Sequence, residues 1–168
     1  MRKAAGRSWT WGAGRAGSRA TLRKRDLDAF GIDLSPGMID VARRDQSGVR
    51  FDIGSMTDLT LADASVTGLV AWYSLIHIPD GAISSVLTHF RRVLRPGGPL
   101  LLSFHVGDAS KLKTEGYGGH PMKVHVHRRQ HDQMIEWLNE AGFAVETHKT
   151  LTSAESKLGG IILARRQP

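Results

Sequence analysis

A helix enclosed between two apolar strands limits the folds open to this chain more than any other feature. Apolar residues recur at helical spacing from Ile83 to Leu94, the stripe expected of a helix that faces a core. Pro96-Gly97-Gly98 ends this helix, and the apolar run Leu100–Phe104 follows at once,. The run Val66–Trp72 before the helix is typical of a buried parallel strand,. Such a unit is parallel and right-handed, so the sequence predicts an α/β fold.

The alternation of strands and helices continues over most of the chain. Further strands are predicted at DAFGID (28–33), Val49–Ile53, Phe143–Leu151 and Gly160–Arg165, and further helices at Pro36–Arg44 and about Gln130–Ala141,. The last two strands lie close enough in sequence to pair as an antiparallel ribbon. We therefore expect a doubly wound, Rossmann-like, mostly parallel sheet that ends in an antiparallel ribbon. Gly107–Arg129 is predicted to be a long polar connection, where function often resides.

The positive charge of the chain is concentrated at its N-terminus. Eight of the 23 lysines and arginines lie in residues 1–25, which contain no acid, so the remainder carries 15 basic against 16 acidic side chains. The head is rich in Gly, Arg, Ala and Ser and shows no regular period. We expect residues 1–26 to be a poorly ordered basic head and residues 27–168 to be the folded domain. Such a head can bind nucleic acid weakly, whereas the body gives no reason to expect it.

Composition excludes several classes of protein. The chain has no cysteine, which excludes disulfides and thiolate zinc sites and suits a reducing, cytoplasmic location. No apolar run approaches the length of a membrane span,. The basic N-terminus also lacks the apolar core of a secretory signal,.

The segment AFGIDLSPGMIDVARR (29–44) carries the clearest functional signal. Its apolar strand ends in Asp33, and Ser35-Pro36 opens the following helix, since proline suits the first helical position. A carboxylate at the carboxyl end of a central strand can accept hydrogen bonds from a ribose diol. The segment therefore favours a nucleotide-like ligand, although a simple turn cap would need the same acid.

The order of these pieces resembles the class I S-adenosylmethionine-dependent methyltransferases of the small-molecule type. The resemblance runs from about Leu27 to Arg166 and is most specific in FGIDLSPGMIDVARR, RFDIGSMTDL and HFRRVLRPGGPLLLSF, together with the terminal ribbon. It implies that S-adenosylmethionine is the cofactor and that Asp33 holds its ribose. The same resemblance places the adenine and its surroundings at Leu34, Met38, Ser55, Met56 and Ala71. Many members carry an aspartate where Ser55 stands.

The chain departs from the family at its first motif. Members begin with an apolar strand and an acidic, glycine-rich turn that approaches the methionine end of the cofactor. Gly12, Gly14 and Gly17 form only a G-x-G-x-x-G pattern, and the residues before them contain no acid and no apolar strand,. The first central strand is thus atypical or missing. Either the head supplies a makeshift strand around Arg7–Trp11, or the fold is marginal. The abrupt change of composition near Leu27 suggests a head of different origin.

Acceptor-side groups are expected after the fourth and fifth strands. These candidates are Tyr73, His77 and His105, because groups beyond the carboxyl ends of the strands face the side where a small-molecule substrate would bind. His77 is a weak candidate for a catalytic base, because imidazole titrates near neutrality, and a structural role is its alternative. His125 and His127 would share one side of a strand, with His120 and His131 nearby. No acid lies between Tyr117 and His131, and we predict no metal site.

Three functional hypotheses remain open. The first is methyl transfer to a small-molecule acceptor. The second is an NAD(P)-dependent oxidoreductase, suggested by the Gly12–Gly17 pattern with Asp33 16 residues beyond it, but the chain has no Tyr-x-x-x-Lys dyad. The third is a non-enzymatic or inactive methyltransferase remnant, suggested by the altered first motif. The acceptor and the oligomeric state do not follow from the sequence.

Overall fold

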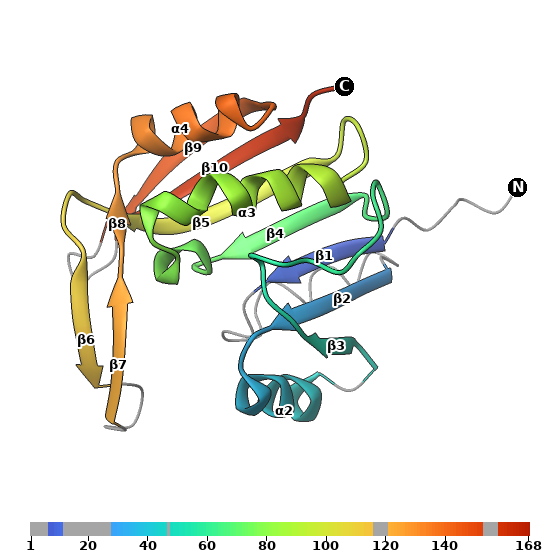
Figure 1. Cartoon of the computed structure of the whole chain (residues 1–168), viewed down its shortest axis with the longest axis horizontal. Coiled ribbons are helices and arrows are strands. Elements are labelled where there is room, and N and C mark those ends of the chain that lie inside the picture. The colour runs from blue at the N-terminus through green and yellow to red at the C-terminus, as the bar shows by residue number, and fades with distance from the viewer. Residues whose placement is uncertain (1–6, 12–27, 47, 116–120, 153–157) are drawn as a thin grey trace, which may run out of the picture.

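An eight-stranded sheet organises the chain, with the strand order β3-β2-β1-β4-β5-β10-β9 and with β8 paired to β5 (Figure 1). The structure is a computed structural model that describes residues 7–11, 28–46, 48–115, 121–152 and 158–168. Its strands are β1 (Arg7–Trp11), β2 (Asp28–Asp33), β3 (Arg50–Ile53), β4 (Gly68–Trp72), β5 (Pro99–Val106), β8 (Arg128–Arg129), β9 (Phe143–Thr152) and β10 (Leu158–Arg166). A separate antiparallel pair is formed by β6 (Lys111–Glu115) and β7 (Pro121–Val126). The helical elements are α2 (Pro36–Asp45), η1 (Leu75–His77), α3 (Asp80–Val93) and α4 (His131–Glu140).

The basic head supplies the central strand of the sheet. Strand β1 pairs in parallel with β2 on one side and with β4 on the other, and Trp9 lies opposite both Phe30 and Leu69. A makeshift central strand around Arg7–Trp11 was one of the two alternatives that the sequence allowed. Residues 7–11 are therefore part of the sheet, which differs from the poor order expected of residues 1–26. The rest of the head lies outside the described residues.

The predicted architecture is confirmed. Strands β2, β1, β4 and β5 run parallel, whereas β10 runs antiparallel to both β5 and β9. Helix α3 lies across β4 and β5 in Figure 1, and its stripe Ile83, Val86, Leu87, Phe90 and Val93 is fully buried. A second, smaller cluster beneath α2 consists of Ile39, Ala42 and Phe51. Helix α3 ends at Val93, before the predicted Pro96–Gly98 stop. Gly97, with a φ of +74°, belongs to the turn that leads into β5,.

The connection between β3 and β4 contains no helix, and an arginine of α3 holds it in place. The Arg92 guanidinium donates to the carbonyl oxygens of Leu59 and Leu61 at 2.5 and 2.6 Å. It also pairs with the Asp63 carboxylate at 2.7 Å. These bonds satisfy loop carbonyls that a helix would otherwise satisfy internally. Arg92 thereby fixes the path of the chain that follows Ser55 and Met56.

The substitution Thr10→Pro tests the position of β1. Proline removes the backbone N–H of a strand that is paired on both sides and leaves a partner carbonyl unsatisfied, so we expect a loss of about 1–3 kcal/mol of unfolding free energy. Urea unfolding followed by circular dichroism measures this loss. Thr10→Ala keeps the N–H and is the matched control. An unchanged unfolding midpoint in Thr10→Pro would show that β1 is not in the sheet.

Candidate functional site

The carboxyl ends of the parallel strands meet at one edge of the sheet. Trp11 of β1 lies opposite Ile32 of β2 and Ala71 of β4, so Asp33 and Trp72 both follow at the same level of this edge. In open α/β sheets, ligands bind in the crevice outside these carboxyl ends. We therefore built the candidate site from the residues along this edge.

Asp33 is held by the junction between β2 and α2. One of its carboxylate oxygens accepts a hydrogen bond from the Ser35 backbone N–H at 2.9 Å. Ser35 caps α2 in turn, since its Oγ accepts from the Met38 N–H at 3.4 Å, and Pro36 takes the first helical turn,. The Asp33 carbonyl accepts from the Gly54 N–H at 3.1 Å, which ties the ends of β2 and β3 together. The carboxylate thus has a defined position.

Apolar side chains are exposed around this acid. Leu34 is 67% exposed, Met38 38% and Ile53, at the end of β3, 57%. Leu34 and Met38 are two of the residues that the sequence assigned to the cofactor, whereas Ile53 was not foreseen. A group of exposed apolar residues next to polar groups is typical of a ligand surface. The signal for Ile53 was available, because it is an apolar residue at the carboxyl end of a predicted strand.

Met56 and Ala71 lie elsewhere than the sequence assignment implied. Met56 belongs to the main hydrophobic core, and Ala71 is fully buried between β1 and β5. Their side chains therefore pack against protein and offer a ligand no surface of their own. Ser55 is at the surface, where its Oγ bonds Thr57 Oγ1 at 2.7 Å and accepts from the Thr57 N–H at 3.2 Å.

Tyr73 and His105 are brought together after β4 and β5. Their rings lie 4.9 Å apart between centroids. Tyr73 has a φ of +49°, which is unusual for a bulky residue and is often found at functional sites,. Its N–H donates to the Ser103 Oγ at 2.8 Å and to the Ser103 carbonyl at 3.1 Å, so β5 holds the strained turn. Trp72, which is 37% exposed, packs edge-on against the Tyr73 ring and was not foreseen.

His77 is oriented by a backbone contact. Its Nδ1 lies 3.2 Å from the His125 carbonyl oxygen. Because a carbonyl only accepts, this bond places the ring proton on Nδ1 and leaves the lone pair on Nε2.

The segment 107–129 is more regular than the polar connection that we expected. It contains the β6–β7 ribbon, which stands apart from the main sheet in Figure 1. The His127 N–H donates to the Ile76 carbonyl at 2.7 Å, and Ser110 Oγ lies 2.7 Å from His127 Nδ1. The ribbon is thereby fastened to η1, beside His77.

The histidines of this region do not form a metal centre in the part of the chain that the structure describes. No group of three or more candidate ligands occurs among those residues. The His125 and His127 rings stack at 6.2 Å, whereas His131 packs against Phe104 at 5.3 Å. His120 lies outside the described residues.

A buried arginine that sequence reasoning missed holds together the η1 turn and the start of α3. The Arg129 side chain is fully buried, and its guanidinium donates to the carbonyl oxygens of Leu75, at 2.8 Å, and of Ile78. It also pairs with the Asp80 carboxylate at 2.8 Å. Burial lowers the pKa of Arg129, and Asp80 opposes that shift. No sequence signal marks this residue, because its partners lie about fifty positions earlier in the chain.

The glycine pattern at Gly12, Gly14 and Gly17 lies outside the described residues. The structure does describe the residue immediately before it, Trp11, which ends β1 at the same edge as Asp33. The pattern therefore follows a strand, which is one of the two contexts that a cofactor-binding glycine turn requires.

The matching family model and the curated relatives are described as methyltransferases. The family model described as a methyltransferase domain matches residues 10–98, more than half of the 168 residues. This match begins inside the basic head. The chain is 33% identical over 81 residues to the malonyl-[acyl-carrier protein] O-methyltransferase of Serratia marcescens, covering 48% of this chain and 31% of that protein. It is 34% identical over 84 residues to the O-methyltransferase rstn1 of Aspergillus nomiae, covering 46% and 36%. The chain therefore matches about a third of the length of these curated relatives.

Solved structures show the same fold. A structure described as SAM-dependent methyltransferases from Methanosarcina mazei superposes with a TM-score of 0.82 at 18% identity, covering 99% of this chain and 94% of that one. The 1,6-didemethyltoxoflavin-N1-methyltransferase of Burkholderia thailandensis, solved with bound S-adenosylhomocysteine, gives a TM-score of 0.77 at 20% identity, covering 97% and 72%.

We expect Arg129→Met to destabilise the fold strongly. The substitution leaves the carbonyls of Leu75 and Ile78 without their donor, at a cost of about 1–3 kcal/mol each, whereas the Asp80 carboxylate, which is 56% exposed, remains in contact with water. Urea unfolding gives the value. Arg95→Met removes an exposed arginine and is the control. A loss below about 1 kcal/mol would contradict the assigned role.

The pKa of His127 predicts a pH dependence of stability. Burial lowers this pKa below 6.5, and so do the charges of Arg129, His125 and His77, while Asp80 opposes the shift. As the pH falls below the pKa of a free imidazole, the unfolded state takes up a proton before the folded state does. Stability therefore declines until the pH passes below the folded pKa.

His127→Gln should reduce this decline. We expect the unfolding midpoint of the variant to fall less than that of the wild type between about pH 7.5 and about pH 5. Thermal unfolding across this range measures the effect, and His148→Gln is the control for removal of a surface histidine. Equal slopes in the wild type and in His127→Gln would refute the linkage.

Proposed function

Because the chain belongs to the methyltransferase domain family, we propose that it transfers a methyl group from S-adenosylmethionine to a small-molecule acceptor. The observation that carries this proposal is the arrangement at the end of β2. Asp33 lies there in a defined position, with exposed Leu34 and Met38 beside it. A carboxylate next to an apolar surface suits a ribose joined to an adenine.

The residues present fit the cofactor. A carboxylate offers about four acceptor positions, so the bond from Ser35 leaves room for ribose hydroxyls at Asp33,. Leu34, Met38 and Ile53 supply apolar surface for the base, and Ser55 supplies a hydroxyl at the end of β3. Met56 and Ala71 would support this surface from the core rather than contact the cofactor. Gly12 and Gly14, which follow β1 directly, are placed in the sequence to approach the methionine end.

The chemistry asks little of the protein beyond alignment. S-adenosylmethionine supplies an electrophilic methyl group on a sulfonium, which an acceptor displaces in line. The chain must orient the acceptor, exclude water and, for a protonated acceptor, remove a proton. We propose that Tyr73 and His105 form the wall of the acceptor site. Nε2 of His77 is the candidate base, because the His125 carbonyl holds the proton on Nδ1.

Two other hypotheses make different predictions. A remnant without activity would fold but fail to bind the cofactor or to turn over. The oxidoreductase hypothesis is not favoured by the comparisons, in which the family and both curated relatives are methyltransferases. It would require the chain to bind a nicotinamide cofactor.

Composition supports a proposal for the location and the contacts of the protein. The absence of cysteine suits a reducing compartment,, and we propose a cytoplasmic location. No helix in the described part of the chain is long and apolar enough to span a bilayer. We also propose that any contact with nucleic acid is weak and limited to the basic head.

Calorimetric titration with S-adenosylmethionine, with NADH as the control ligand, tests the proposal. Saturable binding of S-adenosylmethionine alone, followed by methyl transfer in an acceptor screen, is the expected result. Binding of neither ligand by a folded chain would favour the inactive remnant. Binding of NADH alone would favour the oxidoreductase.

Asp33→Ala should weaken the affinity for S-adenosylmethionine. Loss of charged hydrogen bonds to the ribose costs about 1.5–3 kcal/mol, which is about 10- to 150-fold in Kd. Asp45→Ala, at the far end of α2, is the matched control. An unchanged Kd in a folded Asp33→Ala variant would remove this residue from the site.

A further inference from the structure

A hollow of about 560 Å³ lies at the opposite edge of the sheet from the candidate active site. Its lining includes Asp63 and Ala64, which precede β4, and Gly142, which precedes β9. It also includes Arg166, at the end of the antiparallel strand β10. All of these residues lie at the amino ends of the parallel strands. The hollow is therefore separate from the edge that carries Asp33.

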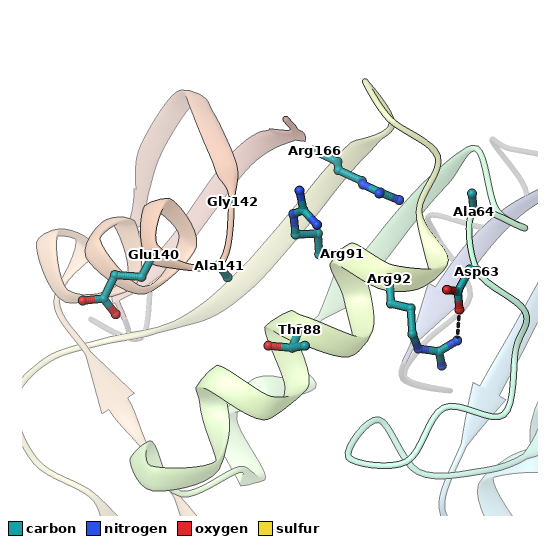
Figure 2. Close-up of a pocket in the computed structure, with 9 residues that line it drawn as sticks. All are labelled: Asp63, Ala64, Thr88, Arg91, Arg92, Glu140, Ala141, Gly142 and Arg166. Carbon is teal, nitrogen blue, oxygen red and sulfur yellow. Dashed lines mark hydrogen bonds and ion pairs between the residues drawn. The ribbon is translucent and has the colours of Figure 1, made fainter. Parts of the chain in front are cut away.

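Three arginines line this hollow, and one of them is already neutralised. Arg92 pairs with Asp63 at 2.7 Å, as Figure 2 shows, and its other donors reach loop carbonyls. The remaining acid of the lining, Glu140, points away from the arginines in Figure 2 and has no ion pair to any described residue. Arg91 and Arg166 thus share the hollow, and no Asp or Glu side chain among the described residues pairs with either of them.

Arg91 is positioned against a glycine. A Cβ at Gly142 would lie 2.6 Å from the Arg91 Nε, and Gly142 has a φ of +78°, so its lack of a side chain makes room for the guanidinium. Figure 2 shows the Arg91 side chain extending from α3 toward the end of β10. Its hydrogen bond to the Pro168 carbonyl oxygen is long, at 3.4 Å. Most of its donors therefore have no partner among the described residues.

Arg166 also has donors to spare. One terminal nitrogen donates to the Leu94 carbonyl, which fixes the side chain against the end of α3. Its Nε is buried and has no hydrogen-bond partner among the described residues. A buried donor without a partner is costly, and in a native structure a water molecule or an ion commonly satisfies it.

We propose that this hollow binds the phosphate group of a small molecule between Arg91 and Arg166. Two guanidinium groups in one hollow repel each other, and a dianion between them neutralises both charges. The planar fork of each guanidinium matches two oxygens of a phosphate, which gives strong charge-assisted hydrogen bonds. The hollow falls within the volume range of small-molecule sites and exceeds the needs of one phosphate,. The hollow therefore has room for the rest of a small molecule that carries the phosphate.

Calorimetric titration of the full chain with inorganic pyrophosphate tests this site, with acetate as the carboxylate control. We expect saturable binding of pyrophosphate and at least a tenfold weaker affinity in both Arg91→Gln and Arg166→Gln. Arg44→Gln removes the same charge from α2 and should bind like the wild type. Circular dichroism checks that each variant is folded. Arg91→Gln is decisive if Arg166→Gln fails to fold, because the Arg91 side chain makes only the long bond to Pro168 among the described residues.

Failure to bind pyrophosphate by the folded wild-type chain would overturn the proposal. Equal affinity in the wild type and Arg91→Gln would also overturn it, as would an equal loss in Arg44→Gln. Preference for acetate over pyrophosphate would reject phosphate as the ligand class. None of these results depends on S-adenosylmethionine binding, so this test and the test of the methyltransferase function can fail independently.

Discussion

A guanidinium group withdrawn from water holds the turn after β4 and the start of α3 in place. Arg129 joins the carbonyls of Leu75 and Ile78 to Asp80, the first residue of α3, and lies at the point where the ribbon returns to the sheet. The ion pair with Asp80, which is 56% exposed, adds little stability by itself,. The bonds from Arg129 to the two carbonyls fix the geometry of the η1 turn. The turn carries His77, and the ribbon fastened to it supplies the carbonyl that orients His77.

The two edges of the sheet perform different tasks. At the carboxyl edge, an acid and exposed apolar residues form a surface suited to a nucleoside. At the amino edge, helix and strand ends bring arginines together, where they satisfy backbone carbonyls at Leu59, Leu61 and Leu94. The hydrogen bonds of these arginines stabilise the fold. A ligand at this edge would bind the guanidinium N–H groups that do not donate to backbone carbonyls.

Regular elements were predictable from the sequence, but contacts between distant segments were not. The stripe of α3, the start of α2 at Ser35-Pro36 and the terminal ribbon follow from spacing and capping residues,. The position of Asp33 follows from them. The sequence allowed strand β1 as only one of two alternatives, because its pairing depends on neighbours far along the chain. The burial of Met56 and Ala71 and the contacts of Arg129 depend on tertiary packing, which periodicity does not reveal.

Strand β1 also sets a length within the site. Among the described residues, β2 and β4 meet only through β1, so the strands that carry Asp33 and Trp72 stand two interstrand spacings apart. That separation is about 9.5 Å. A ligand that reaches from Asp33 to the turn at Tyr73 must span roughly this distance. Strand β1 comes from the least regular part of the sequence. It therefore determines the length of the ligand that fits between the ends of β2 and β4.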